Sequence, residues 1–301
     1  MKVLITGATG LVGDEIVSLL LQNGISIHYL STSQKKIENE PNYKGFFWNP
    51  DQGIIDENCL MGVDAIIHLA GANIAHRWTK AYKQEIIESR INSTNLLFKI
   101  LKNNPHQVKQ IVSASGTAIY PDSDTEVYTE ESKEISDSFL GTVVLKWEAS
   151  VDKLQLLNIK VCKLRTGMVL SNKGGALMEM VKPIKLYVGS PFGNGKQMQT
   201  WIHVHDLAAL YLFAVQNQLE GIYNAVAPEV VSNEAMTKAI AHTLKKPLFM
   251  PNVPKFIMKL LLGEMHELLF ENRKLSAQKA INDGFHFKYT KIDKAVENLL
   301  G

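Results

Sequence analysis

The sequence has few cysteines, no long apolar run and no excess of charge of one sign. Its 301 residues include only Cys59 and Cys162, in no CxxC or Cys/His pattern, which excludes a disulfide framework and favours reduced thiols in the cytoplasm. No apolar stretch reaches the roughly 18 residues of a membrane span. The 32 basic and 30 acidic residues leave a net charge of +2, so we expect neither nucleic acid nor membrane as a partner.

The chain alternates short apolar runs with stretches of helix length. Strand-like runs occupy residues 2–6, 26–30, 64–71, 109–116 and 159–167, and amphipathic stretches occupy 11–23, 80–102 and 140–157. This alternation is typical of βαβ units, and near-continuous apolar strands are typical of a sheet covered on both faces. The sequence therefore predicts an α/β fold with a doubly wound parallel sheet, followed by a smaller and mostly helical domain.

The regular alternation ends near Gly167. We expect a first domain over residues 1–167, to which 200–226 returns, and a substrate and C-terminal domain over 168–301. The glycine-rich segment 188–200 has the character of a loop that carries a site, so Gln199, Thr200 and Trp201 are predicted to line a cleft. Core packing is the alternative for Trp201. The apolar stretch 256–262 is predicted to be a core helix rather than a membrane contact.

Three glycines, Gly7, Gly10 and Gly13, stand between the first strand and the first helix. Such a turn lets backbone N–H groups and a helix N-terminus approach a pyrophosphate, as in Rossmann domains. An ordinary glycine-rich turn is the alternative. The predicted dinucleotide site comprises the turn and the end of the strand over 64–71, namely Gly7, Thr9, Gly10, Leu11, Val12, Gly13, Leu69, Ala70 and Gly71.

The end of the second strand bears on the choice of cofactor. An acidic residue there would bind the ribose of NAD and repel a 2′-phosphate. The sequence instead has Ser31, Thr32 and Ser33, followed by Lys35 and Lys36. Hydroxyls and lysines suit a phosphate, so NADP is favoured and NAD stays the alternative. Each lysine alone is equally well explained as a solvated loop charge.

Several motifs, in order and spacing, resemble those of one known family. They are TGATGLVG, HLAGANIAHRW, SRINST, SASGTAIY, KWE, LRTGMVLSNKGGAL, WIHVHDLA, YNAVAPE and GFHF. Together they cover essentially the whole chain and resemble the extended short-chain dehydrogenase/reductases, within the atypical branch of epimerase family proteins that carry a short C-terminal domain of unknown function. The resemblance implies a Rossmann domain that binds NADP(H) and a C-terminal domain that closes a cleft.

The superfamily commonly uses a Tyr-x-x-x-Lys pair for acid/base chemistry, and this chain departs from that pattern. No tyrosine is followed by lysine four residues later. If Glu148 matches the glutamate that usually follows the pair, Leu140 and Val144 occupy its positions. If Lys146 is the lysine, Thr142 replaces the tyrosine. The remaining catalytic candidates are Ser113, Ser115 and Tyr120 after the fourth strand, with packing or capping as their alternative roles.

Other polar residues have structural alternatives. His68 is predicted to be a satisfied structural histidine within its strand. Arg90 is a candidate to hold a phosphate or carboxylate of the cofactor or substrate, or else forms a surface ion pair on its own helix. His203 and His205 share a strand face without an identifiable third ligand, and Asp206 is predicted to be structural, so no metal site is expected.

These observations favour an NADP(H)-binding oxidoreductase or epimerase-like enzyme that acts on a small polar substrate, nucleotide-linked or carbohydrate-like. The rival hypothesis is a cofactor-dependent sensor or interaction protein that has lost its chemistry, as the missing tyrosine and lysine suggest. A monomer or homodimer is expected. The retained serines and the segment 188–200 favour the enzyme.

Overall fold

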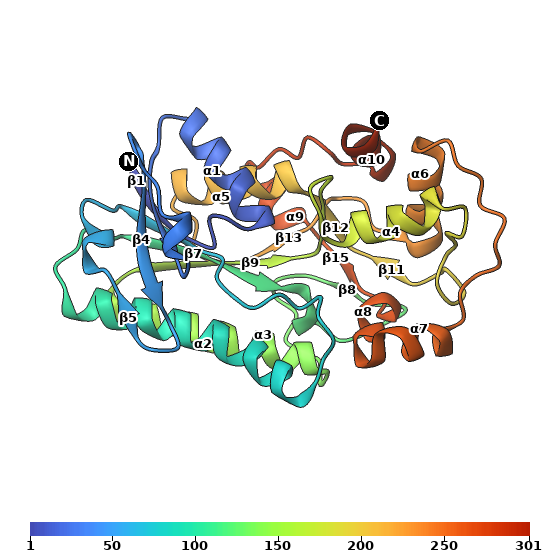
Figure 1. Ribbon diagram of the computed structural model, residues 1–301, viewed down its shortest axis with the longest axis horizontal. Helices are drawn as coiled ribbons and strands as arrows, with labels where there is room; N and C mark the ends of the chain where they lie inside the picture. Colours follow the sequence, from blue (N-terminus) through green and yellow to red (C-terminus); the bar gives the residue numbers. More distant parts are fainter.

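The computed structural model describes residues 1–301, and its centre is a mostly parallel sheet (Figure 1). The strand order is β13-β9-β7-β6-β1-β2-β4-β3, with β5 paired to β4; β3 and β5 are antiparallel to β4 and all other neighbours are parallel. The bounds are β1 Lys2–Thr6, β2 Ser26–Ser31, β3 Asn39–Glu40, β4 Tyr43–Asn49, β5 Ile54–Ile55, β6 Ala65–His68, β7 Gln110–Gly116, β9 Lys160–Thr166 and β13 Gly221–Ala225.

The direction of strand addition reverses at β1. The chain builds β2 and β4 on one side of β1, and β6, β7 and β9 on the other. In doubly wound sheets, ligands bind outside the carboxyl ends of the strands at this switch point. The order and the parallel pairing confirm the predicted Rossmann-type α/β fold.

Helices cover both faces of the sheet (Figure 1). The helices α1 (Leu11–Gln22) and α5 (Val204–Gln216) pack on one face, and α2 (Lys80–Asn103) and α3 (Phe139–Asp152) on the other. Each face has its own apolar core, with Ile16 and Leu210 in the first and Leu97 and Trp147 in the second. Burial on both faces explains why these strands are apolar throughout.

The C-terminal part has a third core, which contains Trp201. Its helices are α4 Gly175–Lys185, α6 Asn233–Thr243, α7 Lys255–Leu262, α8 Glu267–Phe270, α9 Gln278–Asn282 and α10 Ile292–Leu300. Two short strand pairs lie within residues 168–301: β10 (Met168–Leu170) with β12 (Trp201–His203), and β11 (Met198–Gln199) with β14 (Val231–Ser232). A third pair, β8 (Val127–Tyr128) with β15 (Lys274–Leu275), joins this part to the rest. No helix is both long and apolar enough to span a membrane.

Asp206 ties the C-terminal segment to α5. Its carboxylate accepts hydrogen bonds from the backbone N–H groups of Lys288 at 3.0 Å and Tyr289 at 2.8 Å. The strand β13 follows α5 in the sequence and pairs with β9 in parallel. The chain therefore returns to the main sheet before it enters the C-terminal segment. Asp206 thus has the structural role expected from its sequence context.

The sequence-based elements differ from the structure at three places. The strand β4 was not predicted, because Lys44 and Gly45 interrupt its apolar run; a Cβ at Gly45 would lie 2.6 Å from the Tyr29 ring. The predicted helix over 140–157 is α3 followed by a 3₁₀ segment, Lys153–Leu157. The helix expected over 256–262 is present as α7, but its expected place in the core is wrong, because α7 has no buried residue.

Candidate dinucleotide and active site

The glycine turn joins β1 to α1 at the switch point. Gly7 has a φ of +75°, which L side chains rarely adopt. A Cβ at Gly13 would lie 2.1 Å from the Gly7 carbonyl oxygen, so the turn packs directly on the helix. Gly10 caps α1 without a side-chain bond, and the N–H groups of the first helical turn lack intrahelical partners. This is a backbone cradle that fits a pyrophosphate.

The segment after β6 is held beside this turn by buried side chains. Thr6 Oγ1 accepts hydrogen bonds from the N–H groups of Leu69 and Ala70, each at 3.0 Å, and lies 2.8 Å from His68 Nδ1. His68 Nε2 is 3.1 Å from Thr94 Oγ1. Burial lowers the pKa of His68 to about 3, so the ring is neutral and structural, as expected.

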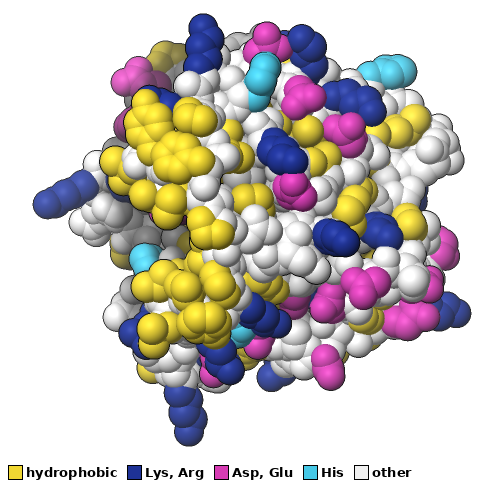
Figure 2. Space-filling view, turned by 90° about the vertical axis from the view of Figure 1, so that its right-hand side faces the viewer, with side chains coloured by type: hydrophobic (Ala, Val, Ile, Leu, Met, Phe, Trp, Pro, Cys, Tyr) yellow, Lys and Arg dark blue, Asp and Glu magenta, His cyan; other side chains and the backbone are white.

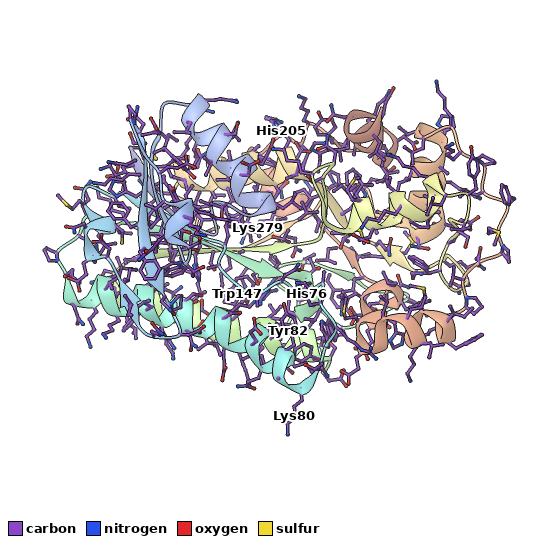
Figure 3. All side chains as sticks on the ribbon, viewed as in Figure 1. His76, Lys80, Tyr82, Trp147, His205 and Lys279 are labelled. Carbon is purple, nitrogen blue, oxygen red and sulfur yellow. The ribbon has the colours of Figure 1, made fainter.

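Arg90 reaches the same segment from α2. Its Nη1 donates to the carbonyl oxygens of Ile86 at 2.9 Å and Ala72 at 3.2 Å. The guanidinium lies 5.0 Å from the ring centroid of Trp147, which Figure 3 places in the layer of α2 and α3. Burial lowers the pKa of Arg90 to about 10, and no carboxylate contributes. The surface ion pair is therefore wrong, and Arg90 supports the chain at Gly71 and Ala72.

The hydroxyls after β2 divide into two kinds. Ser31 Oγ donates to the Ser33 carbonyl at 3.0 Å and accepts from the Ser33 N–H at 3.1 Å, so it shapes the turn. The Ser31 hydroxyl is thus already engaged, whereas Thr32, Lys35 and Lys36 are exposed and Ser33 is half-buried.

A groove of about 780 Å³ runs from the glycine turn along α1 to β3. Its walls include the carboxylates of Asp14, Glu38 and Glu40, and one lysine, Lys173. Lys173 Nζ lies 2.6 Å from Asp14 Oδ2, so its charge is compensated. Residues of the glycine turn line the same groove, and no residue from Thr32 to Lys36 does.

At the carboxyl end of β7, the two candidate serines have different partners. Ser113 is fully buried and its Oγ donates to the Ala114 carbonyl at 2.9 Å. Ser115 Oγ donates to Glu148 Oε1 at 2.5 Å. Because the Ser115 proton is directed to a carboxylate, this hydroxyl offers its lone pairs to a third group and therefore acts as an acceptor.

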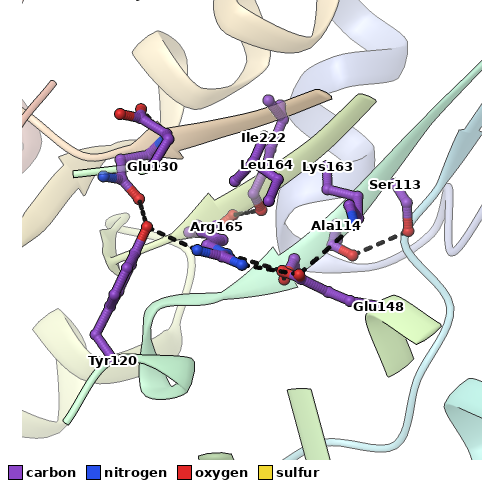
Figure 4. Close-up of polar contacts among 12 residues, drawn as sticks. Ser113, Ala114, Tyr120, Glu130, Glu148, Lys163, Leu164, Arg165 and Ile222 are labelled. Atoms are coloured by element: carbon purple, nitrogen blue, oxygen red, sulfur yellow. Dashed lines mark hydrogen bonds and ion pairs between the residues drawn. The ribbon is translucent and has the colours of Figure 1, made fainter. Parts of the chain in front are cut away.

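Glu148 belongs to a buried polar network that Figure 4 shows. Arg165 donates to both carboxylate oxygens, from Nε and from Nη2, at 2.9 Å each. Lys163 Nζ lies 3.7 Å from Glu148 Oε2 and 2.7 Å from Asp152 Oδ1. Burial raises the pKa of Glu148, but the bonds from Arg165 outweigh it and hold the pKa below its usual value. The carboxylate is thus ionised and satisfied.

Tyr120 lies at the other end of this network, beyond Arg165. Its side chain has 0% exposure and stacks on Tyr128 at 5.2 Å between ring centroids. The hydroxyl accepts from Arg165 Nη1 at 2.9 Å and donates to Asn224 Oδ1 at 2.8 Å, and burial raises the tyrosine pKa. Because both partners of the Tyr120 hydroxyl belong to the protein, the structure favours the packing alternative for Tyr120.

The structure also bears on which residues of α3 take the usual tyrosine and lysine positions. Leu140 and Val144 face inward, and Val144 Cγ2 lies 3.1 Å from where a Cβ on Gly116 would stand. Lys146 is exposed on the opposite face, which Thr142 shares. The structure therefore favours the register with Leu140 and Val144 over that with Thr142 and Lys146. The two positions that usually hold tyrosine and lysine are apolar here.

The three residues predicted to line a cleft are buried. Trp201 has 0% exposure and lies in the third core, so its packing alternative holds. The Thr200 carbonyl accepts from the Met168 N–H at 2.9 Å, which joins two segments of backbone. Gln199 is 7% exposed and its Oε1 has no partner. Trp201 Nε1 also lacks a hydrogen-bond partner, so both Gln199 and Trp201 have an unused polar atom.

The importance of Arg165 was missed from the sequence. Lys163 and Arg165 alternate along a strand that was predicted to be covered on both faces. Buried cations need buried partners, so this alternation was a signal for a nearby carboxylate. The sequence suggests for Glu148 only a match to the glutamate that usually follows the Tyr-x-x-x-Lys pair. Nothing in the sequence predicts its contact with Ser115.

A Rossmann sheet with a glycine-rich turn at its switch point defines a nucleotide-binding protein of the dinucleotide type. The model of the NAD-dependent epimerase/dehydratase family matches residues 3–225, and that of a domain of unknown function, DUF1731, matches residues 253–299. The chain belongs to the NAD-dependent epimerase/dehydratase family.

Relatives and solved structures agree with this assignment. Epimerase family protein SA0724 of Staphylococcus aureus is 34% identical over 298 residues, which cover 99% of this chain and 98% of the relative. The structure of human epimerase family protein SDR39U1 with NADPH has a TM-score of 0.86 and 27% identity, covering 100% and 99% of the two chains. UDP-glucose 4-epimerase of Thermus thermophilus with NAD has a TM-score of 0.78, 18% identity and coverage of 100% and 98%, and supports the fold.

Proposed function

We propose that the chain is an NADP(H)-dependent oxidoreductase or epimerase-like enzyme that acts on a small polar substrate, of the nucleotide-linked or carbohydrate class. The observation that carries the proposal is the backbone cradle at Gly7, Gly10 and Gly13, beside the end of β7 where Ser115 stands. The free thiols of Cys59 and Cys162 are buried, which supports the cytoplasm as the compartment.

The residues around the turn fit a nicotinamide dinucleotide. The N–H groups of Leu11 and Val12, at the start of α1, are positioned to bind its pyrophosphate. Thr32, Ser33, Lys35 and Lys36 would surround a 2′-phosphate, and no carboxylate lies between Glu15 and Glu38 to hold the ribose of NAD. The NADPH bound to the human relative of similar fold favours the same cofactor.

The cofactor, when bound, supplies hydride transfer at a carbon that bears oxygen. For this chemistry the protein must orient the substrate oxygen. Ser115 suits a substrate hydroxyl, because its own proton is directed to Glu148 at 2.5 Å and its lone pairs can accept one hydrogen bond more. Glu148 is a positioning residue, since Arg165 keeps it ionised.

The alternative is a sensor or interaction protein that binds the cofactor and performs no chemistry. Leu140 and Val144, the apolar residues at the usual tyrosine and lysine positions, favour it. The two functions differ in whether bound NADPH or NADP⁺ is turned over.

Turnover across a panel of carbonyl compounds, alcohols and sugar nucleotides, followed by NADPH absorbance, tests the proposal. With a substrate from this panel, Ser115→Ala is expected to lower turnover about a hundredfold, the usual loss for a polar contact to a reacting oxygen. Cofactor affinity should not change. Ser113→Ala is the matched control, since its hydroxyl bonds only the Ala114 carbonyl, and should keep turnover within about threefold.

The same assay examines Tyr120. Because its hydroxyl is enclosed by Arg165 and Asn224, Tyr120→Phe should lower stability while leaving turnover of the folded protein intact. A hundredfold loss in Tyr120→Phe, or none in Ser115→Ala, would contradict the placement of Ser115 in the site. A saturated holoprotein that turns over no compound of the panel would favour the sensor.

A further inference from the structure

One end of the molecule exposes an unusual number of large apolar side chains. Helix α7 has no buried residue, and Phe256, Leu260 and Leu261 are 71%, 81% and 65% exposed. Figure 2 views this end and shows hydrophobic side chains in two groups, with both basic and acidic side chains at their margins. The other large exposed side chains in the neighbouring segments are Leu186, Tyr187, Val188, Phe249 and Met250. We call these eight residues the apolar end face.

The segments that carry the face are joined to one another. The Val253 N–H donates to the Pro191 carbonyl at 2.9 Å, and the Gly193 N–H donates to the Val253 carbonyl at 2.8 Å. Lys246 Nζ lies 2.6 Å from the Tyr187 hydroxyl and 4.2 Å from the centroid of its ring. Chain 186–193 therefore runs beside chain 246–253, which leads directly into α7.

The segments that carry the face, residues 185–193 and 245–262, contain lysines and no acidic residue, and Glu179, Glu234 and Glu264 at their margins are each paired with a lysine. No aspartate or glutamate occurs between Glu179 and Asp206, or between Glu234 and Glu264. Five lysines in these stretches border the apolar residues and have no carboxylate partner: Lys185, Lys245, Lys246, Lys255 and Lys259. The whole chain carries a net charge of only +2, so these segments are more basic than the chain as a whole. The net charge of the whole chain does not show this local excess of lysine.

We propose that the apolar end face docks on an anionic lipid surface. Protruding apolar side chains insert into the boundary between headgroups and acyl chains, and surrounding lysines attract the anionic headgroups. A second copy of this chain is the less suitable occupant, because a two-fold interface would bring the five lysines of both copies together. The five unpaired lysines, in segments without acidic residues, are therefore complementary to anionic lipid rather than to the same face.

Sedimentation of the chain with lipid vesicles tests this docking. We expect about tenfold more protein on vesicles of phosphatidylcholine with roughly 30% phosphatidylglycerol than on phosphatidylcholine alone. The excess should disappear as salt rises from about 0.05 M to about 0.5 M. Leu260→Ser with Leu261→Ser, and separately Lys255→Glu with Lys259→Glu, should each reduce binding by about tenfold or more.

The matched control is Met61→Ser with Leu156→Ser, which removes side chains that are 65% and 77% exposed elsewhere. This variant should bind vesicles like the parent chain. Equal binding to neutral and anionic vesicles, no binding to either, or unchanged binding in both α7 variants would overturn the proposal. A dimer that light scattering detects and that Leu260→Ser with Leu261→Ser abolishes would assign the face to a second copy.

Discussion

Gly13→Ala is expected to lower the free energy of unfolding by about 3 kcal/mol, at the upper end of the cost of overpacking. The new Cβ would stand 2.1 Å from the Gly7 carbonyl oxygen and 2.8 Å from Ala8 Cα, both backbone atoms that cannot move without opening the turn. Dinucleotide binding should be lost as well, because the pyrophosphate cradle depends on that turn. Urea denaturation and fluorescence titration with NADPH measure the two effects.

Gly10→Ala is the informative control for this prediction. Its Cβ would lie 3.3 Å from the Gly7 carbonyl oxygen, and its φ of −88° suits any residue. The variant should stay folded, within about 1 kcal/mol of the parent, and still bind NADPH more weakly, because the methyl group occupies the approach of the pyrophosphate. Normal NADPH affinity in both variants would show that the turn has only a structural role.

Arg165→Met is expected to cost about 3–5 kcal/mol of stability, the usual penalty for leaving a buried carboxylate without its partner. Glu148 would lose two hydrogen bonds of 2.9 Å and Tyr120 one of the same length. The double variant Arg165→Met with Glu148→Leu removes both charges and should recover much of the loss. Urea denaturation of the parent and the two variants measures this, and a double variant no more stable than Arg165→Met would contradict coupling.

The pH dependence gives the same network a second test. In the parent chain the pKa of Glu148 is depressed, so its contribution is present above the unfolded pKa of about 4.3 and is lost as pH falls through the folded pKa. In Arg165→Met, burial raises the folded pKa instead. The penalty in that variant should shrink as pH falls toward about 4, and a constant difference between the two proteins would contradict an ionised Glu148.

The arrangement of the sheet and the glycine turn could be predicted because both follow from local patterns. Apolar runs bounded by turns mark β1, β2, β7 and β9, and the glycines stand within seven consecutive residues. The strand β4 escaped detection because Gly45 is required by a contact with Tyr29 from another strand. Local propensity carries no information about such a contact.

The roles of the site residues depended on contacts across the fold. Tyr120 follows the strand that carries Ser115, yet its hydroxyl is bonded to Arg165 and Asn224 from two other strands. The register of α3 was ambiguous until the inward face was known to carry Leu140 and Val144. Conversely, α7 is apolar enough to suggest a core, but its position at the end of the molecule leaves it exposed.

Titration of the chain with NADPH and with NADH, followed by fluorescence, is the measurement that tests the proposed function most directly. We predict saturable binding of both, with NADPH tighter by about tenfold or more, which corresponds to about 1.4 kcal/mol. Lys35→Ala with Lys36→Ala should weaken NADPH and leave NADH unchanged, because only NADPH carries the 2′-phosphate. The absence of saturable binding, or an affinity for NADH tenfold higher than that for NADPH, would contradict the proposed NADP(H)-dependent function.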